Sequence, residues 1–238
     1  MMLTLLTHGG GDGFYSYSMF CTKAALLLQM SGEDWQRQDV HNPAELARMP
    51  HTKLPVVRDD TSTLIPDSEG IRRFLEDRGA EFDAGLSAVQ KGQSRALIRM
   101  VDESLWLQLM CARWLEDDGW AGMLQTVFAG VPEEPVNGFR AKVLDGLHFT
   151  GHSRFDRAER LKRLEQDLTA IESILGDQRF LFGDQMTAAD CSTAPMIEAL
   201  SRAPAAPQAV EVTQRHGKLL AYVSRVMEQG ALTLPQAA

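Results

Sequence analysis

Cysteine is scarce in this sequence of 238 residues, and the three that occur, Cys21, Cys111 and Cys191, are widely separated. An odd and sparse set of cysteines argues against the disulfide framework of a secreted domain and favours a reducing compartment. Neither Cys111 nor Cys191 has a His or Cys nearby at the spacing of a metal-ligand motif. We therefore expect a cytoplasmic protein without a metal site.

Long apolar runs and an excess of positive charge are also missing. No stretch approaches the ~20 apolar residues that a membrane-spanning helix requires. The first seven residues contain no Lys or Arg, whereas a signal peptide begins with a positively charged segment. Lys and Arg number 24 against 32 Asp and Glu, a net charge of −8, which disfavours nucleic-acid binding. Neither a membrane nor a nucleic acid is therefore an expected partner.

The first eighty residues contain short apolar runs that alternate with helical patterns. The runs predict strands over residues 3–7, 35–40, 54–58 and 62–65. Helices are predicted over residues 18–31 and from 67 or 68 to 78, and Gly32 and Gly79 end them. This order predicts a small α/β domain over residues 1–80.

From residue 88 onward the patterns are helical. Apolar residues recur at helical spacing over residues 97–109 and 161–175. Ser153, with Asp156, is predicted to begin the second of these helices, and Gly176 to end it. Thr187 and Asp190 predict a capping box, while the proline-containing residues 131–138 and 203–207 are predicted to be loops. Residues 88–238 are thus predicted to form an all-helical domain.

Ser18 and Cys21 lie at the predicted start of the first helix. The first turn of a helix presents free N–H groups and the positive end of the helix dipole, which together stabilise a thiolate. Ser18 cannot be a redox nucleophile, but its hydroxyl can donate a hydrogen bond to a thiolate that a ligand brings. These residues alone favour the interpretation that Ser18 is only a helix cap and Cys21 only a small buried residue.

Two further segments, Lys53-Leu54-Pro55-Val56 and Pro66-Asp67-Ser68-Glu69-Gly70-Ile71, resemble the N-terminal domain of the glutathione S-transferase superfamily. The resemblance implies a thioredoxin-like fold in which Pro55 is cis and the backbone of Leu54 pairs with the cysteinyl part of glutathione. It also implies that Asp67 and Ser68 hold the γ-glutamyl end. Lys53 is expected to meet the glycyl carboxylate.

The second half resembles the same superfamily. The segment from Phe180 to Asp190, FLFGDQMTAAD, is similar to the helix-capping motif of its C-terminal domain. Together with LHFTGHSRF over residues 147–155, it resembles the metaxin and failed-axon-connections-like branch. In this superfamily the first long helix of the helical domain lines the second-substrate pocket, and here it carries Trp106, Cys111, Arg113 and Trp114.

The resemblance implies conjugation of the glutathione thiol to a small electrophile by a homodimer, with glutathione as co-substrate. Ser18 is the expected thiol activator. Met19 stands where the family usually has Pro, and the loop before it is long and rich in glycine, so Tyr17 or Tyr15 of that loop are alternatives. Two other functions stay open. One is a non-catalytic, metaxin-like scaffold, and the other is glutathione-dependent thiol exchange through Cys21.

Overall fold

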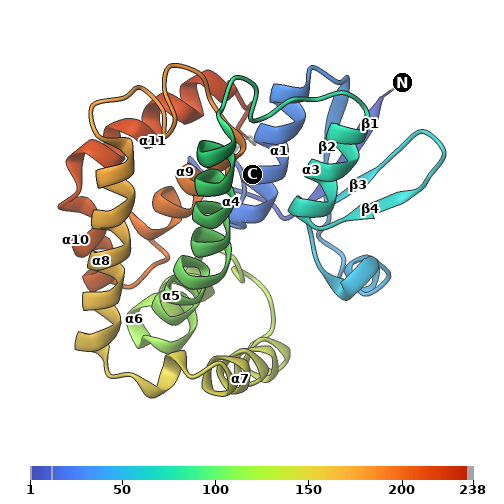
Figure 1. Ribbon diagram of the computed structural model, residues 1–238. Coiled ribbons are helices and arrows are strands. Elements are labelled where there is room, and N and C mark those ends of the chain that lie inside the picture. The colour runs from blue at the N-terminus through green and yellow to red at the C-terminus, as the bar shows by residue number, and fades with distance from the viewer. Residues whose placement is uncertain (1, 12, 235–238) are drawn as a thin grey trace.

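The computed structural model describes residues 2–11 and 13–234. A small sheet with helices α1 and α3 forms one side of the molecule, and a larger group of helices forms the other (Figure 1). The arrangement is a thioredoxin-like sheet domain followed by a helical domain, as the sequence predicts. The predicted boundary falls in the segment between α3 (Ser68–Asp77) and α4 (Ala88–Arg99).

The sheet has the strand order β2-β1-β3-β4. β1 (Leu3–Thr7) pairs in parallel with β2 (Trp35–Asp39) and antiparallel with β3 (Val56–Arg58), which pairs antiparallel with β4 (Leu64–Pro66). All four predicted strands are confirmed, with ends that differ by a residue or two. β1 is buried along its whole length, because it lies inside the sheet and is covered by helices.

Helix α1 (Met19–Ser31) makes the crossover between the parallel strands β1 and β2. It begins after Ser18 and ends at Gly32 in the left-handed conformation with φ +73°, as predicted. The sequence did not reveal two short elements between β2 and β3. These are α2 (Pro43–Leu46) and the 3₁₀ turn η1 (Pro50–Thr52).

The remaining elements are helical. In chain order after α4 they are η2 (Met100–Leu105), α5 (Trp106–Met110), η3 (Cys111–Leu115), α6 (Asp117–Gln125), α7 (Glu133–Phe149), η4 (His152–Arg154), α8 (Arg157–Leu175), α9 (Ala188–Leu200), α10 (Pro207–Gln214) and α11 (Gly217–Gly230). The elements η2 and η3 are π-helical turns that flank α5 in one continuous rod. π-Helical turns inside longer helices are frequent at functional sites.

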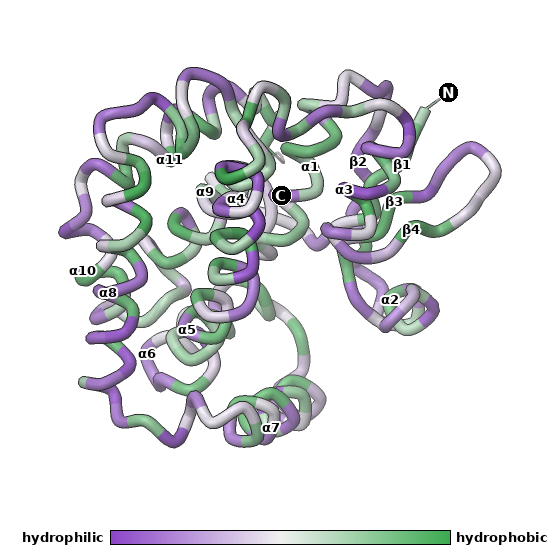
Figure 2. Tube along the Cα trace, viewed as in Figure 1, coloured by the Kyte–Doolittle hydropathy of each residue, from purple (hydrophilic) through white to green (hydrophobic). Residues whose placement is uncertain are grey.

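The core lies where α1 and α9 pack against each other. Figure 2 shows that both helices are largely apolar, whereas α8 and the sheet edges carry more polar residues. The predicted apolar stripe over residues 97–109 is confirmed, because Leu97, Val101, Leu105 and Leu109 are all buried. The stripe over residues 161–175 is buried except at Leu161, which is partly buried. The two parts of the molecule therefore share one hydrophobic core rather than meeting at a polar surface.

Two sequence predictions in the helical part are wrong. Residues 131–138 were predicted to be a loop, but α7 begins at Glu133 and contains Pro135 in its first turn. Proline is tolerated there because the first N–H groups of a helix have no partner within the helix. Ser153 does not begin α8 but lies in η4, and the carboxylate of Asp156 accepts the N–H of Glu159 at 2.8 Å.

The capping box at the start of α9 is confirmed. Asp190 Oδ2 accepts the N–H of Thr187 at 2.7 Å and its hydroxyl at 2.8 Å. Oδ1 accepts the N–H of Leu181 at 3.0 Å and the hydroxyl of Tyr222 at 2.9 Å. The fully buried Asp190 therefore ties the start of α9 to the preceding loop and to α11.

Candidate active site

The N-terminal end of α1 is the first feature of the site. Ser18 precedes the helix in an extended conformation, and its carbonyl accepts the N–H groups of Cys21 and Thr22 at 3.0 and 3.1 Å. The Ser18 side chain makes no capping hydrogen bond and is partly exposed. Its position at the positive end of the α1 dipole suits stabilisation of an anion.

The glycine-rich loop before α1 folds back on itself. A Cβ on Gly10 would lie 2.4 Å from the carbonyl oxygens of Phe14 and Tyr15, so only glycine fits this close approach. Tyr17 is partly exposed, and its hydroxyl lies 2.9 Å from the position that a Cβ on Gly11 would take. The loop thus holds the Tyr17 hydroxyl close to its own backbone.

Tyr15 does not fit the role of thiol activator. It is buried to 1% exposure, and burial raises the pKa of its phenol above the usual value. Arg37 lies 4.2 Å from the centre of its ring and donates to its carbonyl at 2.6 Å. Tyr15 is therefore a packing residue, whereas Ser18 and Tyr17 are hydroxyl-bearing residues at this end of α1 that are partly exposed.

Cys21 does not fit thiol exchange. Its side chain is fully buried in an apolar cluster with Leu6, Val40, Leu54 and Val56. Burial raises the pKa of its thiol, against the opposing effect of polar groups of the preceding loop. An exchange thiol must be exposed and of low pKa. Cys21 points into the core because it lies on the face of α1 that covers the sheet.

If the protein conjugates glutathione, as the resemblance implies, we expect the Cys21→Ala variant to keep the rate of the parent within about twofold, because only a buried contact is lost. Initial rates per folded protein, with the folded fraction measured by circular dichroism, check this. A loss of most of the activity in well-folded Cys21→Ala would contradict the burial argument. The parent should also resist thiol-specific labelling at Cys21 until it unfolds.

The loop before β3 and the start of α3 form the second feature. The Leu54–Pro55 peptide bond is cis, as the resemblance implies. The Pro55 carbonyl accepts the N–H of Asp67 at 3.1 Å, so the two expected glutathione-binding segments lie side by side. Leu54 and Cys21 share one apolar cluster, which brings this loop against the first turn of α1.

Asp67 has a backbone conformation that is unusual for a residue with a side chain. Its φ is +68° with ψ 139°, and its carboxylate accepts the N–H of Gly70 at 3.4 Å. Backbone strain of this kind costs of order 1–3 kcal/mol and is concentrated at functional sites. In this conformation the Asp67 side chain is exposed, while the neighbouring Ser68 is buried. Lys53 is exposed as well.

A buried ion pair fixes α1 relative to the helical domain. The Lys23 ammonium lies 2.6 Å from Asp102 Oδ2 and 3.9 Å from Glu69 Oε2. Lys23 lies in α1, Asp102 in η2 and Glu69 in the first turn of α3. The N-terminal ends of α1 and α3, at Ser18 and Ser68, are therefore held in fixed positions relative to each other. We call these two helix ends, together with the Leu54–Pro55 loop, the frame of the site.

The rod from α4 to η3 approaches this frame at two points. The rings of Phe20 in α1 and Trp106 in α5 lie 6.1 Å apart, and both side chains are partly exposed. Arg113 Nη1 donates to the Tyr17 carbonyl at 2.7 Å. Sequence reasoning placed Trp106 and Arg113 on this helix but gave no indication of the Arg113–Tyr17 contact.

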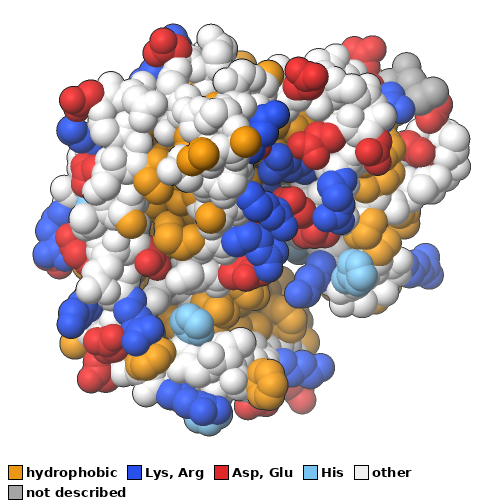
Figure 3. All heavy atoms as spheres, viewed as in Figure 1, with side chains coloured by type: hydrophobic (Ala, Val, Ile, Leu, Met, Phe, Trp, Pro, Cys, Tyr) orange, Lys and Arg blue, Asp and Glu red, His pale blue; other side chains and the backbone are white. Residues whose placement is uncertain are grey.

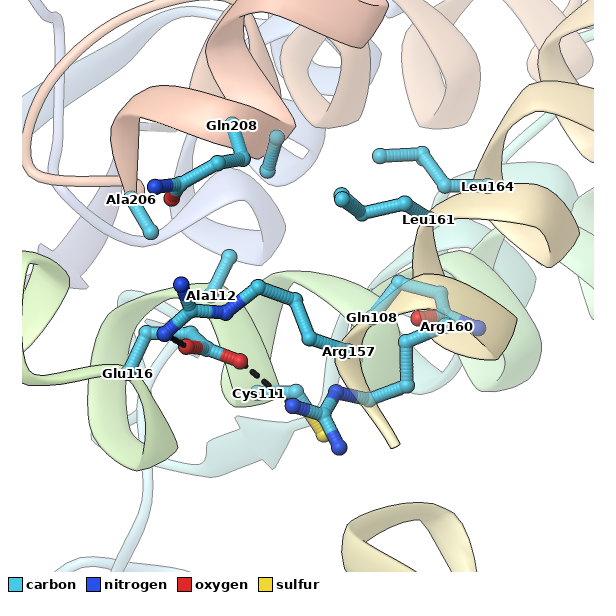
Figure 4. A pocket seen from close by; sticks show the side chains of 11 residues that line it. Gln108, Cys111, Ala112, Glu116, Arg157, Arg160, Leu161, Leu164, Ala206 and Gln208 are labelled. Atoms are coloured by element: carbon cyan, nitrogen blue, oxygen red, sulfur yellow. Dashed lines mark hydrogen bonds and ion pairs between the residues drawn. The ribbon is translucent and has the colours of Figure 1, made fainter. Parts of the chain in front are cut away.

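Trp114 and Cys111 belong to two other parts of the helical domain. Trp114 belongs to an aromatic cluster with Trp120, Phe128 and Phe139. Cys111 lines a pocket between η3, α8 and α10, where the Glu116 carboxylate faces the guanidinium groups of Arg157 and Arg160 (Figure 4). Burial raises the pKa of the Cys111 thiol to about 11. No predicted glutathione-binding residue lines this pocket.

Within residues 2–11 and 13–234, no group of three or more His, Cys, Asp or Glu side chains is arranged to hold a metal ion. In the same part of the chain, no helix is long and apolar enough to cross a membrane.

These features define a class: a thioredoxin-like domain that presents two helix N-terminal ends beside a cis-proline loop, followed by a helical domain. Family models for glutathione S-transferase match both parts, the N-terminal domain over residues 19–119 and the C-terminal domain over residues 154–225. The chain belongs to the glutathione S-transferase superfamily.

Similarity to individual proteins supports this assignment. The isoprene-epoxide–glutathione S-transferase of Rhodococcus sp. (strain AD45) is 27% identical over 239 residues, which cover 96% of this chain and 99% of that protein. A glutathione S-transferase of Ceriporiopsis subvermispora, solved in complex with glutathione, superposes with a TM-score of 0.63 at 16% identity. That match covers 96% of this chain and 99% of the Ceriporiopsis protein. At this sequence identity it shows a shared fold.

Metaxin-1 is a more distant relative. The protein of Macaca fascicularis is 23% identical over 199 residues, which cover 79% of this chain but 62% of metaxin-1. The chain therefore spans less than two thirds of the length of that relative. The similarity agrees with the expected metaxin resemblance, while the assignment to that branch stays a prediction.

Proposed function

We propose that the protein conjugates the thiol of glutathione to a small electrophile. The observation that carries the proposal is the meeting of the Leu54–Pro55 loop, the strained Asp67 and the N-terminal ends of α1 and α3. An extended peptide with an anionic thiol at its centre fits such a frame, since both helix ends favour negative charge.

Each part of glutathione finds a complementary group in this frame. The backbone of Leu54 pairs with the cysteinyl residue, as a sheet edge pairs with an added strand. Ser68 and the N–H groups of α3 bind the α-carboxylate, and Asp67 binds the α-ammonium. Lys53 meets the glycyl carboxylate. Between α3 and α4, Figure 3 shows Lys and Arg side chains next to Asp and Glu side chains, and ion pairs join some of these cations to the carboxylates.

The chemistry is a nucleophilic attack by sulfur. The Ser18 hydroxyl and the end of the α1 dipole stabilise the thiolate, with Tyr17 as the alternative hydroxyl donor. The thiolate forms a C–S bond with the electrophilic carbon while the bond from that carbon to the leaving atom breaks. The leaving atom then takes a proton from water, and no covalent enzyme intermediate forms.

A small epoxide is the electrophile that we propose. The relative matched over nearly its whole length is named for an isoprene epoxide. The partly exposed Phe20, in the first turn of α1, and Trp106 offer an apolar surface, which suits a small apolar electrophile. We further propose a homodimer in the cytoplasm, where the three unpaired, buried cysteines would stay reduced.

Incubation with glutathione and a small alkyl epoxide tests the proposal, with the thioether adduct measured by mass spectrometry. We expect enzyme-dependent adduct formation that saturates with glutathione. Saturable glutathione binding without turnover on epoxides, alkyl halides or activated aromatic halides would contradict the enzymatic function. That result would favour the non-catalytic scaffold, for which the similarity to metaxin-1 is the supporting observation.

A further inference from the structure

Arg113 is a cation buried between the helical domain and the loop that precedes α1. Its side chain is 4% exposed, and its Nε and Nη2 atoms are buried without a hydrogen-bond partner. Among the residues that the structure describes, no carboxylate forms an ion pair with it. A buried charge is costly unless it is compensated, so an uncompensated guanidinium in a folded enzyme calls for an explanation.

The position of Arg113 is tightly determined. A Cβ on Gly119 would lie 1.8 Å from the Ala112 carbonyl oxygen and 3.1 Å from the Arg113 Cα. Helix α6 therefore lies directly against the backbone of η3 at Ala112 and Arg113, because glycine permits this approach. The one hydrogen bond of the guanidinium that the structure describes goes to the Tyr17 carbonyl at 2.7 Å.

That hydrogen bond acts on the peptide group that leads into Ser18. The Tyr17 carbonyl is held by Arg113, and the Ser18 N–H donates to Ser16 Oγ at 3.2 Å. Ser16 Oγ in turn donates to the His8 carbonyl at 2.8 Å. The Tyr17–Ser18 peptide is thus held on both sides, from the helical domain and from the end of β1, which fixes the orientation of Ser18.

The positive charge of Arg113 lies next to the peptide group that leads into Ser18. Burial lowers the pKa of its guanidinium to about 10, so it remains protonated at neutral pH. Arg202, the nearby cation, already pairs with Glu198 at 2.6 Å. In a water-poor interior, an uncompensated cation stabilises a neighbouring anion far more than it does in bulk water. The anion that the proposed reaction brings to the first turn of α1 is the glutathione thiolate.

We propose that Arg113 is a positioning residue for the glutathione thiol: it fixes Ser18 through the Tyr17 carbonyl, and its uncompensated charge favours the thiolate form of the bound tripeptide. The inference rests on the proposed function. The step is an ionisation in which the S–H bond breaks, the electron pair stays on sulfur and the proton goes to solvent water. It requires no oxidant or reductant.

The test is a pH titration of the thiolate absorbance of bound glutathione. In the parent protein we expect the thiol to titrate at least one pH unit below glutathione free in solution. In Arg113→Gln we expect the midpoint to rise by one unit or more, which is about a tenfold loss of thiolate below both midpoints. Arg113→Lys keeps the charge and loses the planar fork, so its midpoint should lie between the two.

Arg140→Gln is the matched control. Arg140 Nε donates to the Trp114 carbonyl at 2.9 Å and its guanidinium lies over the Trp120 ring, so it holds the same region without reaching Tyr17. In Arg140→Gln, the thiol of bound glutathione should titrate at the same midpoint pH as in the parent.

The outcomes separate the two proposals. A parent protein that binds no glutathione overturns the proposed function and this inference with it. If the parent binds glutathione but does not lower the pH midpoint at which the bound thiol ionises, the inference alone is overturned. This result comes from the parent protein and does not depend on the folding of any variant. An unchanged midpoint in folded Arg113→Gln, or equal shifts in Arg113→Gln and Arg140→Gln, also overturns the inference alone.

Discussion

Replacing Ser18 with alanine is expected to lower the proposed conjugation rate at pH 6.5 by about 10- to 100-fold, because a hydrogen bond to a charged group is worth about 1.5–3 kcal/mol. The loss should shrink as the pH rises, since the free thiol then ionises without help. The affinity for glutathione should change by less than about threefold, because Leu54, Asp67 and Ser68 of the proposed site would still hold the tripeptide. Initial rates against pH and glutathione concentration measure both effects.

Ser31→Ala is the matched control for this variant. Ser31 lies in the last turn of α1, where its hydroxyl donates to the Leu28 carbonyl at 2.7 Å, so its loss should leave the rate unchanged. Tyr17→Phe decides between the two hydroxyls. If Ser18→Ala keeps the parent rate and Tyr17→Phe loses it, Tyr17 is the thiol activator.

Replacing Asp190 with alanine is expected to cause the largest loss of stability. The variant leaves the N–H groups of Leu181 and Thr187 and the hydroxyl of Tyr222 without their acceptor. Each buried unsatisfied donor costs about 1–3 kcal/mol, so the free energy of unfolding should fall by at least about 3 kcal/mol. For a chain of this size the melting temperature should fall by about 10 °C.

Asp177→Ala provides the comparison for Asp190→Ala. Asp177 pairs with Lys218 at 3.0 Å, but its side chain is 97% exposed, and exposed ion pairs contribute about 0–1 kcal/mol. Thermal unfolding followed by circular dichroism should separate the two variants clearly. Equal and small shifts in both would contradict the account of Asp190 as the tie between α9, α11 and the preceding loop.

Local chemistry explains what the sequence could predict. Ser18 and Gly32 bound α1, and Thr187 and Asp190 form a capping box, because each of these roles depends on residues within one helical turn. The predicted strands and apolar stripes hold for the same reason, since side-chain period follows directly from backbone geometry. The predicted glutathione-binding segments also lie side by side.

Long-range contacts explain what the sequence could not predict. Arg113 and Tyr17 are 96 positions apart, and no local pattern links a helical arginine to a loop carbonyl. The choice between a buried and a reactive Cys21 depends on how α1 lies on the sheet, so the sequence left both interpretations open. The helix at Glu133 was missed because its prolines read as a loop, although Pro135 lies in a first turn that tolerates it.

The most direct test of the central claim is calorimetric titration of the purified protein with glutathione, repeated on Asp67→Ala and Asp60→Ala. Asp67 stands in the strained turn before α3, whereas Asp60 lies exposed in the turn between β3 and β4. We expect saturable binding to the parent and to Asp60→Ala. Asp67→Ala should bind about 10- to 100-fold more weakly, since the α-ammonium loses a charge-assisted hydrogen bond. No saturable binding at millimolar glutathione, or equal affinity in all three proteins, would contradict the glutathione site at Leu54, Asp67 and Ser68.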